Sequence, residues 1–243
     1  MRRRTVSATP LHSGYKIKKG SEPYTSTVKL IFIYTQLRDT INHMIIVGIT
    51  GASGALLGIR CIEELVYHNK QIAVIVSKSA WPIIHHEMQT DCTSIISIVK
   101  QRTMQPELLS NIIEYSPDDF FAPIASGSNQ FEATIVIPCS MKTVAAIAHG
   151  YADNLIHRVC DIALKEKRQL VIVPRETPLS ALHLYNLYTL SMYGASVVMP
   201  IPAFYNFPET VDDVVNFIIG RVFDQLHIQH NLYRRWHYEE HTR

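Results

Sequence analysis

Residues 45–54 read Ile45-Ile46-Val47-Gly48-Ile49-Thr50-Gly51-Ala52-Ser53-Gly54, and residues 55–65 follow them with the apolar spacing of a helix. A strand, a glycine-rich turn and a helix in this order predict an anion-binding turn. Glycine lets the turn close tightly, and the helix start presents unpaired N–H groups and the positive end of the helix dipole. The Ser53 hydroxyl is a further donor, so the predicted ligand is a nucleotide or a phosphate ester. A turn that only joins the strand to the helix is the alternative.

The spacing of the glycines narrows the class of ligand. Gly48, Gly51 and Gly54 form G-x-x-G-x-x-G, whereas dinucleotide-binding enzymes use G-x-G-x-x-G. No Lys-Ser or Lys-Thr pair follows the turn, as a P-loop would require. Both NAD and ATP are therefore disfavoured as ligands.

Length and composition are those of a soluble globular domain. The chain has 243 residues, of which 47% are hydrophobic and 18% charged, enough for one domain with a full core. Apolar runs such as 28–34 and 133–139 are much shorter than the roughly 20 residues that span a bilayer, so no transmembrane segment is expected. The four cysteines form neither a C-x-x-C pair nor a Cys/His cluster, which disfavours a zinc site and a disulfide framework and fits a reducing compartment.

Charge is distributed unevenly along the chain. Residues 1–43 carry eight Lys/Arg against two Asp/Glu, and residues 44–243 carry 15 against 19. The mildly acidic body gives little support to nucleic-acid binding. The basic head is typical of an organellar transit peptide or a disordered extension, and Met44 is an alternative start. We predict an extension over 1–43, a catalytic domain over 44–228 and a polar tail over 229–243, in the cytoplasm or, if the head is a transit peptide, in mitochondria.

From Met44 onward, short apolar runs alternate with amphipathic stretches. This pattern predicts a three-layer α/β fold of the Rossmann or flavodoxin-like type, with a parallel sheet and helices on both faces. The expected strands are 45–49, 71–77, 133–138, 170–174 and 196–199, and the expected helices are 55–68, 80–88, 141–149, 154–167, 179–193 and 211–226. The irregular stretch 91–129 is expected to hold a short helix, an edge strand and a functional loop.

Polar residues follow every one of the five expected strands. In an open parallel sheet, ligands bind beyond the carboxyl ends of the strands. Those ends are followed here by 51–53, Ser77, 138–143, 174–178 and 200–205. Taken singly, Ser140 and Thr177 are as well explained as helix N-caps. Five such segments on one rim favour a ligand site.

Six ordered motifs carry a family resemblance. They lie at 47–55, 126–128, 138–143, 175–179, 200–205 and, as two short pieces, at 212–214 and 221–225. With these motifs, residues 44–228 resemble the UbiX-type flavin prenyltransferases, part of a wider flavoprotein group that includes the cysteine decarboxylases. The resemblance implies transfer of a dimethylallyl group from dimethylallyl monophosphate to N5 and C6 of reduced FMN. The prenylated flavin would then serve UbiD-type decarboxylases.

The resemblance also implies roles for individual residues. The FMN site would use Gly51, Ala52, Ser53, Ser77, Ser140, Met141, Lys142, Thr143 and Arg175. Tyr205, Arg221 and Lys165 would bind the prenyl phosphate. A cluster of Lys165, Arg175, Arg221 and the Tyr205 hydroxyl would stabilise the charge that builds on the phosphate, so no metal is expected. Glu176 is the implied proton shuttle. Ser53, Lys165 and, as a secondary candidate, Glu87 complete the implied catalytic set.

Three of these assignments have plainer alternatives. The stretch after Glu87 is longer than the family spacing, which leaves its role open. Lys165 belongs to Lys-Glu-Lys-Arg, which reads equally well as the solvated end of a helix. Arg221 lies on an expected helix and is equally compatible with a solvent-facing position.

Two other functions compete with prenyl transfer. The first is an FMN-dependent decarboxylase of the cysteine or pantothenoylcysteine type, and the second is a flavin-binding subunit without chemistry. Such decarboxylases typically carry an asparagine in the 138–143 loop and a Met-Asn clamp, which this chain lacks there. The presence of Arg175, Glu176, Tyr205 and Arg221 argues against a loss of chemistry. The resemblance further implies a homo-oligomer, a dodecamer, with sites shared between subunits.

Overall fold

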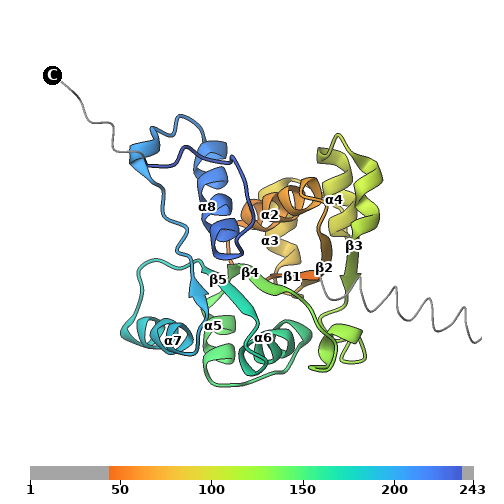
Figure 1. Ribbon diagram of the computed structural model, residues 1–243, viewed down its shortest axis with the longest axis vertical. Coiled ribbons are helices and arrows are strands. Elements are labelled where there is room, and N and C mark those ends of the chain that lie inside the picture. Colours follow the sequence, from red (N-terminus) through yellow and green to blue (C-terminus); the bar gives the residue numbers. More distant parts are fainter. Residues whose placement is uncertain (1–43, 237–243) are drawn as a thin grey trace, which may run out of the picture. The chain divides into compact units, whose positions relative to one another are not determined.

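The computed structural model describes residues 44–236, so the predictions for 1–43 and for 237–243 lie outside the described residues. Six strands form one parallel sheet in the order β3-β2-β1-β4-β5-β6 (Figure 1). The strands are β1 Met44–Ile49, β2 Gln71–Val76, β3 Ile112–Tyr115, β4 Ala133–Cys139, β5 Gln169–Pro174 and β6 Ser196–Val197. Chain order reverses between the neighbours β1 and β4, so the main ligand crevice of such a sheet is expected at their carboxyl ends.

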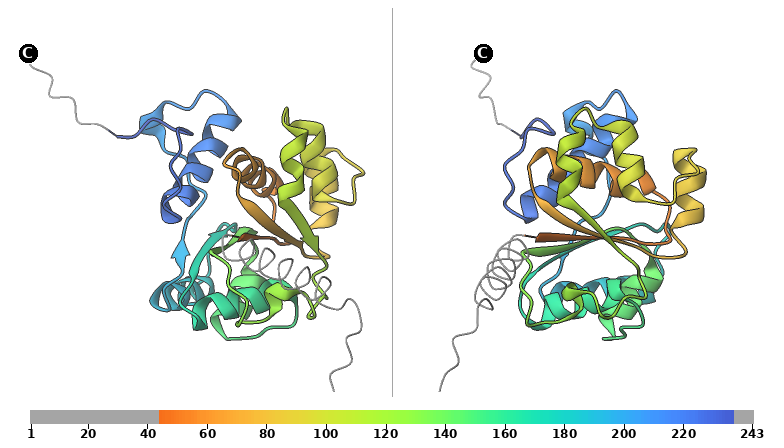
Figure 2. Two further views of the ribbon diagram at one scale, coloured as in Figure 1. Left: turned by 45° about the vertical axis from the view of Figure 1, so that its right-hand side comes forward. Right: turned by 90° about the vertical axis from the view of Figure 1, so that its right-hand side faces the viewer.

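Helices cover both faces of the sheet. One face carries α2 Ala55–Tyr67, α3 Trp81–Met88, α4 Ile95–Arg102 and α8 Val211–Gln225, and the other carries α5 Met141–Ala148, α6 Leu155–Lys165 and α7 Ala181–Met192 (Figure 2). Two apolar cores result, one on each side of the sheet. All seven positions of β4 are buried, as expected of a strand covered on both faces. The predicted three-layer α/β fold is confirmed.

Local signals explain where the elements begin and end. The helix expected from 179 begins at Ala181, because Ser180 and His183 form a capping box. The strand expected over 196–199 is limited to Ser196–Val197 at the sheet edge. The stretch 91–129 holds the predicted short helix, α4, and the predicted edge strand, β3, together with the 3₁₀ turns Pro106–Asn111 and Pro123–Ala125. Within residues 44–236, no helix combines the length and apolarity needed to cross a bilayer.

The first residues of the tail expected from residue 229 pack onto α8. The His230 side chain is only 1% exposed. A Cβ placed on Gly220 of α8 would lie 2.5 Å from Cδ1 of Tyr233 and 2.7 Å from Cε1 of His230. A segment this short has no periodicity from which its packing can be predicted.

Close packing of α2 on the sheet depends on Gly58. A Cβ at this position would lie 2.7 Å from the Ile137 carbonyl oxygen and 3.0 Å from Cδ1 of Ile49. The carbonyl belongs to the backbone of β4 and has little freedom to move. The glycine therefore fixes how closely the helix that follows the β1 turn approaches the sheet.

We predict that Gly58→Ala lowers the melting temperature. Alanine adds about 1 kcal/mol of helix propensity, but overpacking against the β4 backbone costs about 1–3 kcal/mol. Ser97→Ala, at an exposed position of α4, is the control and is expected to melt at or slightly above the wild-type temperature. A Gly58→Ala protein that melts no lower than the wild type would show that α2 does not need this close approach.

Candidate active site

The amide groups at the start of α2 bind a carboxylate from the chain itself. Glu87, in the last turn of α3, accepts hydrogen bonds from the Gly54 N–H (2.9 Å) and the Ala55 N–H (2.8 Å). Gly54 has φ of 101°, a left-handed conformation that favours glycine. The helix start therefore attracts an anion, as the sequence predicts, but within the described chain that anion is Glu87.

Glu87 is held in its ionised form. Partial burial raises the pKa of Glu87, but hydrogen bonds from the Ser53 side chain and the Ala55 and Gly54 amides, with the charge of Arg175, bring it below its ordinary value. The unusual spacing after Glu87 does not keep it from the site, because α3 continues to Met88 and ends beside the β1 turn. The structure thus brings Glu87 together with Ser53 and Arg175.

Arg175 joins the end of β5 to the same turn. Its amide donates to the Cys139 carbonyl (3.0 Å), and its Nε donates to the Ser53 carbonyl (3.2 Å). Glu176 comes next, and its carboxylate accepts the Thr177 N–H (3.0 Å) while the side chain stays partly exposed. The guanidinium of Arg175 and the carboxylate of Glu87, from different elements, therefore meet at the β1 turn, and Glu176 follows Arg175 in the chain.

Thr50 links the β1 turn to the end of β4 and is absent from the predicted site residues. Its hydroxyl donates to the Pro138 carbonyl (2.8 Å) and accepts the Ser140 N–H (2.7 Å). Ser140 in turn caps α5, because its hydroxyl accepts the Thr143 N–H (3.3 Å). Thr177 is not a cap, since Ser180 caps α7. The position of Thr50, directly after a buried strand, is the signal that identifies it.

The other predicted flavin ligands line the same rim. Ser77 follows β2, and its hydroxyl lies 3.2 Å from that of Ser79. A side chain at Gly51 would collide with Ser79, so the turn and the loop after β2 lie close together. Ala52 and Met141 are buried, whereas Lys142 is exposed. Backbone amides, hydroxyls and one guanidinium suit a phosphorylated flavin, and within residues 44–236 no group of three metal-ligating side chains occurs.

Lys165 does not join this rim within one chain. It ends α6, before β5 begins, whereas Arg175 follows the end of β5. Six strand residues separate the two positions, about 20 Å at the usual rise per residue. Lys165 Nζ instead lies 3.3 Å from Glu166 Oε1. Within one chain, the structure therefore does not bring Lys165 and Arg175 together.

Within residues 44–236, Arg221 and Tyr205 likewise make no hydrogen bond, ion pair or ring contact with Arg175. The Gln169 side chain, at the first residue of β5, donates to the Gln225 carbonyl (3.4 Å), which places the last turn of α8 at the amino edge of the sheet. Arg221 lies one turn earlier and borders a cavity of about 280 Å³ with β6. Tyr205 packs edge-to-face against Phe217 of α8, with ring centroids 6.2 Å apart. The two sets of predicted ligands thus occupy different parts of the chain.

Comparisons with known proteins fit this arrangement. Flavin prenyltransferase UbiX from Methanocaldococcus jannaschii is 49% identical over 192 residues, which cover 79% of this chain and 97% of that protein. The crystal structure of a dodecameric FMN-dependent UbiX-like decarboxylase from Escherichia coli O157:H7 has 43% identity and a TM-score of 0.71, and covers 80% of this chain and 100% of its own. The crystal structure of AnUbiX (PadA1) with FMN and dimethylallyl pyrophosphate has 37% identity and a TM-score of 0.72, covering 82% and 100%.

Family membership follows from these matches. The family model described as Flavoprotein matches residues 33–223, which is most of the chain. Each of the three relatives exceeds 30% identity over nearly all of its own length. The chain therefore belongs to the flavoprotein family and, within it, to the UbiX-type flavin prenyltransferases.

Proposed function

We propose that this protein joins the dimethylallyl group of dimethylallyl monophosphate to N5 and C6 of reduced FMN and that the prenylated flavin passes to a UbiD-type decarboxylase. The observation that carries the proposal is the meeting of Ser53, Glu87 and Arg175, with Glu176 beside them, at the point where the strand order reverses. The similarity to UbiX prenyltransferases over most of the chain supports the same reaction.

The rim residues bind and orient the flavin in this proposal. FMN supplies the nucleophilic ring atoms when bound, and the segments 51–53 and 140–143, with Ser77 and Arg175, hold it by its polar edges. Amide and hydroxyl donors at the strand ends leave one face of a flat ring uncovered. Arg175 is fixed by its bond to the Ser53 carbonyl, so it holds its charge in place without rearranging.

The two carboxylates of the site, Glu176 and Glu87, have different roles in this proposal. Ring closure at C6 releases a proton, and in this proposal Glu176 accepts it, because it follows the fixed Arg175 in the chain and its carboxylate is partly exposed. Glu87 has a different role: its bonds to the helix amides keep it ionised and poorly suited to accept a proton, and it orients the Ser53 side chain. No metal is required for either role.

Mass spectrometry of the flavin after incubation with reduced FMN and dimethylallyl monophosphate tests the proposal. We expect one added dimethylallyl group, formed equally with and without EDTA. A parallel incubation with dimethylallyl diphosphate establishes which phosphate is used. A third incubation contains a cysteinyl peptide. Unmodified FMN in the first two incubations, together with release of carbon dioxide from this peptide, would instead identify a decarboxylase. Activity lost in EDTA and restored by Mg²⁺ would rule out the metal-free route.

We predict that Glu176→Gln binds FMN normally but stops after the bond to N5 has formed. The amide cannot accept the C6 proton, so the cyclised product is expected to fall by a factor of about 100 or more. Absorbance spectra and mass spectrometry after alkylation distinguish the open from the cyclised product. Wild-type yield of cyclised flavin would remove Glu176 from this role.

The separation of the two ligand sets motivates a shared site. Within one chain, Gln225 in the last turn of α8 contacts the first residue of β5, whereas Arg175 follows the last residue of β5. Within residues 44–236, no hydrogen bond or ion pair joins the side chains of Arg221 and Arg175. We therefore propose a homo-oligomer, with twelve chains, in which Tyr205 and Arg221 of one subunit, and Lys165, face the FMN held by another.

Mixing two inactive variants tests the shared site. Ser53→Asp places a negative charge in the flavin site, and Arg221→Ala removes a phosphate ligand. After subunit exchange, mixed interfaces contain some sites with both intact halves, so partial activity is expected to return. Each variant exchanged with itself is the control. No recovery after labelled subunits are seen to exchange, or full activity in a monomer, would show that each chain holds a complete site.

A further inference from the structure

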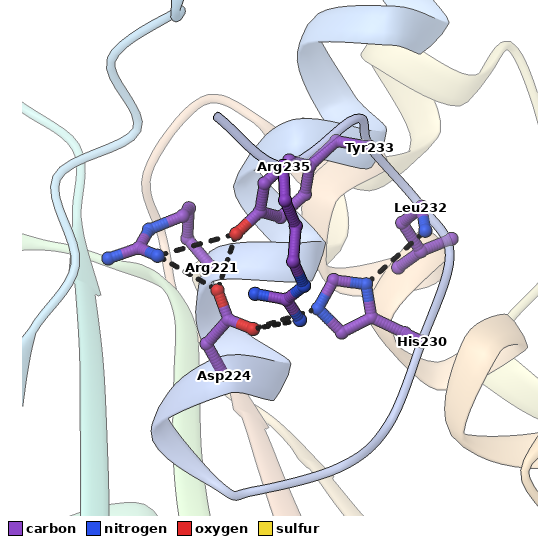
Figure 3. Close-up of polar contacts among 6 residues, drawn as sticks. All are labelled: Arg221, Asp224, His230, Leu232, Tyr233 and Arg235. Atoms are coloured by element: carbon purple, nitrogen blue, oxygen red, sulfur yellow. Dashed lines mark hydrogen bonds and ion pairs between the residues drawn. The ribbon is translucent and has the colours of Figure 1, made fainter. Parts of the chain in front are cut away.

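Asp224, in the last turn of α8, accepts hydrogen bonds from four side chains (Figure 3). Its Oδ2 accepts from Arg221 Nη1 (2.8 Å) and from the Tyr233 hydroxyl (2.5 Å). Its Oδ1 accepts from His230 Nε2 (3.1 Å) and from Arg235 Nη2 (2.9 Å). A carboxylate can only accept, so the His230 nitrogen that faces it carries the proton. Both oxygens are thus used, and the Asp224 side chain is only 14% exposed.

Arg221 is held by one nitrogen and leaves the rest of its guanidinium available. Nη1 also lies 3.3 Å from the Tyr233 hydroxyl. Within residues 44–236, Nε and Nη2 make no hydrogen bond, and the side chain is 46% exposed. Figure 3 shows one end of the guanidinium pointing away from Asp224. The free nitrogens form the edge with which arginine makes paired contacts to a phosphate.

The carboxylate also makes this concentration of positive charge possible. Arg221 and Arg235 would repel one another without the anion between them. With Asp224 ionised, this carboxylate and the two guanidinium groups retain a net charge of +1. Partial burial raises the pKa of Asp224, but the donors from Tyr233, Arg235 and His230 bring it below its ordinary value. The cluster therefore still attracts an anion at neutral pH.

The segment that supplies these donors also contacts the second predicted phosphate ligand. Trp236 packs edge-to-face on Tyr205, with ring centroids 5.3 Å apart. Tyr233 packs on Phe217 at 4.9 Å, and Phe217 packs on Tyr205 at 6.2 Å. Residues 230–236 therefore contact both Arg221 and Tyr205.

We propose that Asp224 and Tyr233 are positioning residues for Arg221, which they hold in one orientation with its free edge ready for the prenyl phosphate. The inference rests on the proposed function, because it takes Arg221 as a ligand of that phosphate. A flexible arginine loses rotamer freedom when it binds, and fixing it beforehand removes that cost. Neither residue touches the substrate in this account. Both act through the guanidinium.

Steady-state kinetics on the full-length protein tests the proposal. Asp224→Asn keeps the shape but weakens the hold on Arg221, and Tyr233→Phe removes only a hydroxyl. We expect KM for dimethylallyl monophosphate to rise about tenfold in Asp224→Asn and about threefold in Tyr233→Phe, while kcat changes less than about twofold. The Kd of FMN, measured by fluorescence quenching, is expected to stay unchanged. Asp224→Glu keeps the charge and is expected to recover part of the affinity.

Two comparisons make the result specific. Asp212 lies on the same helix, and its Oδ1 is 3.7 Å from Nη2 of Arg60. Asp212→Asn removes this carboxylate and is expected to leave KM unchanged. In an Arg221→Ala background, Asp224→Asn is expected to add no further rise in KM, because its effect passes through the arginine.

The outcomes separate the two levels of inference. If Arg221→Ala leaves KM for dimethylallyl monophosphate unchanged, the proposed role of Arg221 fails. If Arg221→Ala raises KM but Asp224→Asn and Tyr233→Phe do not, only the positioning role fails. The positioning role also fails if their effects are fully additive with Arg221→Ala, or if FMN affinity falls in parallel with the rise in KM. If Asp224→Asn does not fold, Tyr233→Phe decides.

Discussion

Unpaired amide groups at the start of α2 are the constraint around which this site is built. A helix start that faces a crevice carries donors and a positive dipole end, and both must be satisfied. Here the carboxylate of Glu87 satisfies them, and its hydrogen bonds fix the turn that precedes the helix. Arg175 then bonds to the carbonyl of Ser53 in the same turn. One electrostatic requirement thus brings β1, α3 and β5 to a common point.

Most of the fold could be predicted because it depends on local patterns. Buried parallel strands read as continuous apolar runs, and the helices between them carry apolar stripes and caps. For the irregular stretch 91–129, only the types of element could be predicted, and not their bounds. Its edge strand and short helix are held by tertiary contacts such as that of Glu114 with Ser94. His230 and Tyr233 pack on α8 where Gly220 has no side chain. No hydrophobic periodicity in the sequence predicts this contact.

In the candidate site, too, the residues set by local patterns could be predicted and those set by tertiary contacts could not. Residues placed directly after strands, such as Ser53, Ser140 and Arg175, could be assigned to one rim because parallel strands end at one edge. Glu87 could not be placed securely, because its position depends on the length and exit of α3. Lys165 and Arg221 could be named by resemblance, but which edge of the sheet they occupy depends on the tertiary positions of α6 and α8.

The carboxylates of Glu87 and Asp224 both accept hydrogen bonds within the chain, but Glu87 occupies the donors it binds and Asp224 leaves part of its donor free. Glu87 takes up the helix-start amides of Gly54 and Ala55, so a ligand phosphate at the rim must rely on hydroxyls, neighbouring amides and Arg175. Asp224 occupies one nitrogen of Arg221 and leaves the other side of the guanidinium free. The two bonds to Glu87 fix the turn between β1 and α2, whereas the single bonded nitrogen of Arg221 leaves donors available for an anion. The difference follows from geometry, since amides offer one donor each and a guanidinium offers five.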